Sequence, residues 1–205
     1  MKGKKTTRYV QGADVVLLCS DAPAGEAPED SAFIANAAVA REVALTAADL
    51  GAHAAPAPVL LVCSDPVNSL VPLMAEVLEL AGALDCGRVL GVAAQDALCA
   101  AGVLSGLSGL GRHRLHVPVV GGRSARTAVP VLSQARPFRN FTSTDWREVR
   151  AALVEREKVS GRSGAQLARG YAAARTALAV VRALRGEPGV NETVFVRSDE
   201  MPGVR

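Results

Sequence analysis

The sequence predicts an α/β protein, because three short apolar runs alternate with stretches of helical pattern. The apolar runs lie at 13–20, 59–64 and 88–92, and such runs are typical of strands buried on both faces of a sheet. Apolar residues recur at helical spacing between them, over 31–50 and 70–81. Strands and helices in this alternation favour a parallel sheet with right-handed crossovers.

Residues with special backbone chemistry mark the ends of these elements. The acidic segment 21–30 contains two prolines and a glycine, which predicts a loop. Ser31 is placed to cap the first helix. Pro72 is tolerated if it lies in the first turn of the second helix, and Gly82 is placed to end that helix.

The pattern of predicted strands and helices changes after Gly111. A short strand is predicted at 116–120, followed by a Gly-Gly turn and an apolar segment at 128–134. A basic helical region follows over 145–184, with a break near 161–164, and a last strand is predicted at 191–196. This change predicts two domains, 1–111 and 112–205.

Composition places the chain among globular proteins. Of its 205 residues 49% are hydrophobic and 21% are charged, which excludes a generic disordered chain. Aromatic residues make up only 3%, and many of the apolar residues are alanine. Because alanine buries little area, we expect a thin core.

Charge is distributed unevenly along the chain. The first 110 residues carry 6 basic and 12 acidic side chains, and the remaining 95 carry 17 basic and 8 acidic ones. A basic half indicates a nucleic acid or another anion as partner, with a solvated arginine-rich surface as the alternative.

The four cysteines show no paired metal-ligand spacing. They are Cys19, Cys63, Cys86 and Cys99, and the first two lie in apolar runs where we expect buried thiols. Free thiols indicate a reducing compartment, and no metal is expected. The basic N-terminus lacks an apolar stretch of the secretory type, and the Gly-rich stretch 89–111 is a poor membrane span, so a soluble protein without membrane contact is expected.

Several stretches resemble the mitochondrial-type branch of the malate dehydrogenase family. The most specific are DPVNSLVPLMAEVLELAG at 65–82, RVLGVAAQDALCA at 88–100 and HVPVVGGRSARTAVPVLSQ at 116–134. The resemblance implies part of a Rossmann-type parallel sheet, the family's strands four to six, in residues 1–111. It implies a truncated α+β catalytic domain of the lactate/malate dehydrogenase fold in 112–205. The family's first three strands, with their G-x-G-x-x-G turn, are then absent.

The resemblance also assigns catalytic positions, and most of them are altered here. The family abstracts a proton with a histidine, and Arg123 stands at that position. An arginine stays protonated and is no base, and loss of a base costs about 10² to 10⁴ in rate. The carboxylate that orients the histidine survives as Asp96, whereas Cys99 stands where the family has a substrate-binding arginine.

Positions toward substrate and cofactor are likewise degenerate. Asp65 replaces a substrate-binding asparagine and puts an acid where an anion binds. The loop 21–30, which carries two substrate arginines in the family, has none. Asn36 matches an asparagine near the nicotinamide ribose, and Cys63, Ser64 and Asp65 are weaker cofactor candidates.

We therefore expect a catalytically inactive relative, a pseudoenzyme that acts as a binding or structural subunit, with no cofactor of its own and NAD implied by the family only. An apolar sheet edge left by the missing strands predicts a homo- or hetero-oligomer. One alternative is an active NAD-dependent malate dehydrogenase whose site another chain completes. The other is an anion- or RNA-binding module, against which the scarcity of aromatic residues, with Trp146 and two tyrosines counted, argues. Family members suggest the mitochondrion or cytoplasm.

Several positions have alternative interpretations. Asp96 either pairs with Arg123 or is solvated. Cys99 is expected to be an inert thiol rather than a nucleophile, and His113 and His116 are expected to have surface or packing roles rather than to ligate. The segment 121–127 suggests a small anion pocket but lacks the Gly-Lys-Ser/Thr ending of a phosphate loop.

Overall fold

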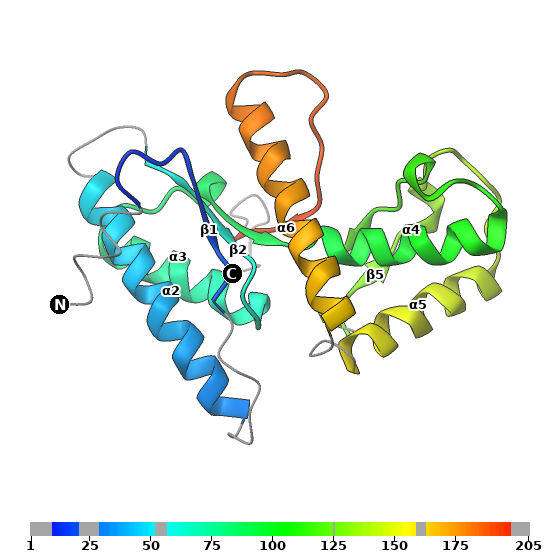
Figure 1. Cartoon of the computed structure of the whole chain (residues 1–205), viewed down its shortest axis with the longest axis horizontal. Helices are drawn as coiled ribbons and strands as arrows, with labels where there is room; N and C mark the ends of the chain where they lie inside the picture. The colour runs from blue at the N-terminus through cyan, green and yellow to red at the C-terminus, as the bar shows by residue number, and fades with distance from the viewer. Residues whose placement is uncertain (1–9, 21–28, 52–56, 125, 159–162, 198–205) are drawn as a thin grey trace, which may run out of the picture. The chain divides into compact units, whose positions relative to one another are not determined.

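The computed structural model describes residues 10–20, 29–51, 57–124, 126–158 and 163–197, and its α/β architecture confirms the predicted fold class (Figure 1). Contacts between Cα atoms divide the chain into two compact units. The sheet unit comprises Met1–Val92, Ala177–Val190 and Val194–Arg205. The second unit comprises Ala93–Thr176 and Asn191–Thr193.

The sheet unit is built on four strands in the order β1-β2-β3-β6. Their bounds are β1 Val15–Leu18, β2 Val59–Val62, β3 Val89–Val92 and β6 Val194–Phe195. The first three run parallel, with Leu18 opposite Val62 and Val62 opposite Gly91. The last strand runs antiparallel to β3. Arg197 forms ion pairs with Glu76 and Glu79, which tie the segment after β6 to the helix between β2 and β3.

Burial differs between the central and the outer strands. All four residues of β2 are buried, as predicted for a strand covered on both faces. In β1 the same prediction is wrong, because this strand lies at the end of the described sheet and Leu17 is 39% exposed. Cys19, expected to be buried with this strand, is exposed, whereas Cys63 is buried.

Two helices of the sheet unit, α2 (Glu29–Gly51) and α3 (Val67–Leu80), pack against each other and the sheet (Figure 1). The buried face of α2 is mainly alanine, with Ala40 and Ala44 fully buried. Small side chains bury little area, so each of these positions adds little to the buried apolar surface. Helix α3 begins after Pro66, earlier than predicted. Pro72 consequently lies in the second turn instead of the first.

Gly91 permits the close approach of β3 to α3. A Cβ atom at this position would lie 2.5 Å from Val67 Cγ1 and 2.9 Å from Val71 Cγ2. Contacts this short do not occur in real structures, so a larger residue at Gly91 would push strand and helix apart.

The second unit packs α4 (Ala94–Ser108) on α5 (Ser143–Lys158). Val149 and Leu153 of α5 are fully buried in the core between them. The remaining short elements are η2 Arg112–Arg114, β4 Val119–Val120, β5 Val129–Pro130 and η3 Leu132–Gln134. The strand predicted at 116–120 is therefore shorter, and His116 forms a separate bridge with Arg136.

Helix α4 belongs to the second unit, so the compact units divide the chain before α4 and not between 111 and 112. The cause is packing, since α4 buries its face against α5. This division does not test the predicted boundary between a dinucleotide-binding part and a catalytic part, which stays a prediction. Helix α6 (Ser163–Leu184) continues from the second unit into the sheet unit after Thr176.

No helix in the described part of the chain is long and apolar enough to cross a membrane. All four cysteines are thiols and not disulfides.

Candidate functional site

A hydrogen-bonded cluster forms where the parallel strands of the sheet unit end. Asn36 of α2 is 5% exposed, and its Nδ2 donates to the carbonyl oxygen of Asp65 at 2.9 Å. The Ser20 hydroxyl donates to Asn36 Oδ1 at 3.2 Å. Ser20 follows β1 and Asp65 follows β2, so one amide joins the segments after two strands. The carboxyl ends of parallel strands are where α/β proteins bind ligands.

The neighbouring candidates serve mainly to hold the strands. Ser64 is 1% exposed, and its hydroxyl donates to the carbonyl oxygen of Leu18 at 3.3 Å. Cys63 is 3% exposed, and its N–H donates to the same carbonyl oxygen. Asp65 is half-buried directly before Pro66 and α3. The four residues that the resemblance assigned to the cofactor thus lie together at one end of the sheet.

These residues fit the implied nicotinamide cofactor poorly. Both amide atoms of Asn36 are engaged by protein groups. The helix that begins at this end, α3, is preceded by the Asp65 carboxylate, and an acid there repels a pyrophosphate. Among the described residues no strand leads through a G-x-G-x-x-G turn into a helix.

The second unit contains a buried ion pair at Asp96, the carboxylate to which the resemblance assigns the orienting role. Asp96 lies in the first turn of α4 and is 2% exposed. Its Oδ1 lies 2.5 Å from a terminal nitrogen of Arg156 in α5, whose side chain is 17% exposed. Burial excludes the alternative of a solvated Asp96. A buried charge needs such a partner, so Asp96 holds α4 to α5.

Arg123 lies against the same turn of α4. A terminal nitrogen of Arg123 donates to Gln95 Oε1 at 2.6 Å, and Gln95 is 6% exposed. Residue 123 therefore reaches the neighbour of Asp96, which is the placement that the resemblance implies. The group at this place is a guanidinium, which donates hydrogen bonds and accepts no proton.

The turn that carries Arg123 joins β4 to β5. Gly121 has φ +86°, and a Cβ there would lie 2.2 Å from the Thr127 carbonyl oxygen, so only glycine fits. The N–H groups of Thr127 and Ala128 both donate to the carbonyl oxygen of Ser124. Because these N–H groups point inward, the turn offers a weaker anion pocket than its sequence suggested.

Cys99 lines a cavity of about 1130 Å³ within the second unit. Gln95, Arg156, Tyr171 and Arg175 line it as well. The two arginines are neutralised, since Arg156 pairs with Asp96 and Arg175 lies 2.5 Å from Glu192. The cavity thus has no strong attraction for a dicarboxylate. In the described residues no group of three His, Cys, Asp or Glu side chains is placed to hold a metal.

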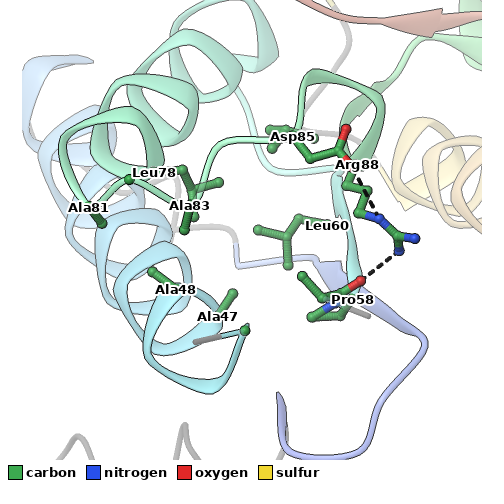
Figure 2. Close-up of a pocket in the computed structure, with 13 residues that line it drawn as sticks. Ala47, Ala48, Pro58, Leu60, Leu78, Ala81, Ala83, Asp85 and Arg88 are labelled. Carbon is green, nitrogen blue, oxygen red and sulfur yellow. Dashed lines mark hydrogen bonds and ion pairs between the residues drawn. The ribbon is translucent and has the colours of Figure 1, made fainter. Parts of the chain in front are cut away.

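In the sheet unit, a smaller cavity of about 220 Å³ lies at the amino-terminal end of β2 and β3 (Figure 2). The Asn36 cluster lies at the other, carboxyl-terminal end of the strands. The lining of the cavity includes alanines and leucines from α2, β2, α3 and the segments next to them, among them Ala47, Ala48, Leu60, Leu78, Ala81 and Ala83, which Figure 2 labels. Arg88 pairs with Asp85 at 3.3 Å and donates to the Ala57 carbonyl oxygen at 2.6 Å. Its charge is therefore engaged, and this end of a parallel sheet is not where cofactors bind. We interpret the cavity as a packing gap left by small side chains.

Sequence reasoning missed Gln95 and Arg156. A signal for Arg156 was present, because Val149, Leu153 and Arg156 lie at spacings of four and three on one face of α5. A charged residue in line with two buried apolar ones indicates a buried partner of opposite charge.

Comparisons with known proteins place this geometry in a family. A scan against protein-family models finds no match. The sequence is 33% identical to the mitochondrial malate dehydrogenase of Caenorhabditis elegans, over 98% of this chain and 59% of the relative. It is 36% identical to the mitochondrial malate dehydrogenase of Schizosaccharomyces pombe, over 95% of this chain and 57% of the relative. The chain thus spans somewhat more than half the length of these relatives.

Solved structures agree on the fold. A malate dehydrogenase from Cryptosporidium parvum matches with a TM-score of 0.71 and 17% identity, over 94% of this chain and 62% of that one. A lactate dehydrogenase from the same organism, complexed with lactic acid and nicotinamide adenine dinucleotide, matches with a TM-score of 0.67 and 17% identity, over 87% of this chain and 58% of that one. The fold is therefore that of the lactate and malate dehydrogenases. In sequence as well as in fold, the chain resembles the malate dehydrogenase family.

Proposed function

We propose that this chain is a non-catalytic member of its family, a pseudoenzyme that acts as a binding or structural subunit. The observation that carries the proposal is the arginine at position 123, hydrogen-bonded to Gln95 beside Asp96. Proton abstraction from a hydroxyl needs a group that is deprotonated near neutral pH. A guanidinium is not such a group.

Two further observations support the proposal. The Asp96 carboxylate forms an ion pair with Arg156. A base introduced at position 123 would therefore compete with Arg156 for Asp96, the group that should orient it. Cys99 stands where the resemblance places a substrate-binding arginine, and a thiol offers a carboxylate no bidentate partner. The positions of the base and the clamp carry other residues, and the surviving carboxylate pairs with Arg156.

We propose the outer edge of β1, at the end of the sheet formed by the described residues, as the surface that binds another chain, a second copy or a related dehydrogenase. Leu17 on this strand is 39% exposed at the end of the described sheet, and an apolar edge strand is a template for pairing. Sedimentation equilibrium tests the surface, with Leu17→Lys expected to dissociate the assembly. Leu80→Lys is the matched control, because Leu80 is 88% exposed on α3. A well-folded monomer of the unaltered chain would contradict the proposal.

The alternative is a malate dehydrogenase that uses NAD and whose site another chain completes. Calorimetric titration with NAD and with NADH separates the two, for the chain alone and mixed with a full-length malate dehydrogenase. We expect no cofactor heat from the chain alone and, from the mixture, the heat of the full-length enzyme only. Additional cofactor sites in the mixture would favour the alternative and overturn the proposal.

A further inference from the structure

One stretch of the second unit carries basic side chains and no acidic ones. Residues 97–144 contain six arginines and no aspartate or glutamate. Four of these arginines are exposed, namely Arg114, Arg126, Arg136 and Arg139. The nearest acid along the chain, Asp145, accepts hydrogen bonds from the N–H and the hydroxyl of Thr142. A local excess of positive charge of this kind attracts a polyanion.

The backbone brings two basic segments side by side. His116 and Arg136 exchange both of their backbone hydrogen bonds, each 2.8 Å long. Leu115 and Val117 on one segment and Ala135 on the other are buried in the core of the second unit. The exposed arginines next to these anchors therefore project from a firmly packed base.

An exposed aromatic ring lies within this charged surface. Phe138 is 70% exposed and stands between Pro137 and Arg139. A terminal nitrogen of Arg139 donates to the carbonyl oxygen of Ser108 at 3.2 Å, which ties the segment to the end of α4. Phe138 is therefore a stacking surface in addition to Trp146 and the tyrosines.

We propose that Arg114, Arg136, Phe138 and Arg139, the basic patch, bind single-stranded nucleic acid. The arginines neutralise backbone phosphates, and the ring of Phe138 stacks on a base, a combination that single-strand binders use. A lipid surface fits the patch less well, because interfacial binding elements are usually amphipathic helices and these four residues lie in a short 3-10 turn and an extended segment. The inference is independent of the proposed loss of catalysis.

Salt dependence tests the phosphate contacts. Fluorescence anisotropy with a labelled 12-nucleotide oligo(U), and in parallel oligo(dT), measures the affinity of the full chain. Three phosphate contacts predict about a 20-fold loss of affinity between 50 and 200 mM salt. The triple variant Arg114→Ala/Arg136→Ala/Arg139→Ala is expected to lose at least tenfold in affinity at about 50 mM salt, together with most of the salt dependence.

A charge-matched control shows whether the location matters. The triple variant Arg41→Ala/Arg147→Ala/Arg185→Ala removes the same charge from exposed sites outside the patch and is expected to change affinity less than threefold. Equal losses in the two triple variants would overturn the proposal, because they would mark a general charge effect. Circular dichroism checks that each variant folds.

Substitutions of the ring test the stacking contact. Phe138→Leu is expected to lower affinity about tenfold without changing the salt dependence, and Phe138→Trp to retain it, because only a flat ring stacks on a base. An unchanged affinity in Phe138→Leu, equal binding of a duplex of the same length, or binding to phosphatidylserine vesicles in place of the oligonucleotides would each contradict the proposal.

Discussion

The two units bury polar side chains that the family resemblance assigns to the reaction, and they satisfy them in opposite ways. In the sheet unit a neutral amide, Asn36, exchanges hydrogen bonds with Ser20 and the backbone of Asp65. In the second unit a carboxylate, Asp96, is matched by the guanidinium of Arg156. A neutral group needs only hydrogen bonds when buried, whereas a charge needs an opposite charge. In the sheet unit Asn36 thus holds the segments after two strands together. In the second unit Asp96 instead forms an ion pair with Arg156.

The largest expected effect comes from breaking the ion pair of the second unit. Arg156→Ala leaves the Asp96 carboxylate buried without its partner, and we expect a loss of about 3–5 kcal/mol in the free energy of unfolding. Urea unfolding followed by circular dichroism measures it. The double variant Asp96→Asn/Arg156→Met removes both charges and is expected to cost clearly less. A loss below about 1 kcal/mol in Arg156→Ala would show that the pair is solvated.

Apolar cores should respond alike in the two units. Leu70 of α3 and Leu104 of α4 are both fully buried, and either leucine replaced by alanine is expected to cost about 2–5 kcal/mol through lost burial and a cavity. Leu80→Ala, at a position that is 88% exposed, is the control with an expected change within about 0.5 kcal/mol. If one core variant behaves like this control, the corresponding unit is not packed as described.

Removing the amide of the sheet unit should cost less than breaking the ion pair. Asn36→Ala leaves the Asp65 carbonyl oxygen and the Ser20 hydroxyl without this partner, and we expect a loss of about 1–3 kcal/mol. The exposed Asn140→Ala is the matched control. Should Asn36→Ala prove as stable as the unaltered chain, the amide would not be part of the scaffold.

The smallest expected effect concerns the start of α5. The N–H and hydroxyl of Thr142 lower the pKa of Asp145 below its ordinary value of 3.8, and Asp145 N–H donates back to the Thr142 hydroxyl. A carboxyl whose folded-state pKa is lowered stabilises the fold above its unfolded pKa, and the gain is lost as the pH falls through the folded-state value. Amide hydrogen exchange in the first turn of α5 should therefore rise, relative to the intrinsic rate, at pH below 3.8. Asp145→Asn should weaken this pH dependence, and an identical profile in both proteins would contradict the interpretation.

The sequence was informative where burial alone decides a position. The run 59–64 predicts a fully covered strand, and β2 is buried throughout. Apolar character cannot distinguish a central strand from an outer one, because the neighbours that cover a strand come from distant parts of the chain. The exposure of Leu17 was missed for this reason.

Polar partners were harder to predict than core positions. The segment with Arg123 was expected beside Asp96, and its guanidinium does reach the adjacent Gln95. The partner of Asp96, however, lies 60 positions further along the chain in α5. Such a pairing depends on how α4 and α5 pack, which hydrophobic periodicity does not specify. The same holds for Phe138, since nothing local to 136–139 says that its ring faces solvent.

Reduction of oxaloacetate by NADH tests the central claim most directly. The purified full chain is compared with a buffer blank, with a mitochondrial malate dehydrogenase as positive control. We expect no rate above the blank for the chain, and none for Arg123→His either, because Asp96 stays paired with Arg156 and Cys99 offers no clamp. A rate clearly above the blank in the unaltered chain would contradict the assignment of Arg123 to the place of the base.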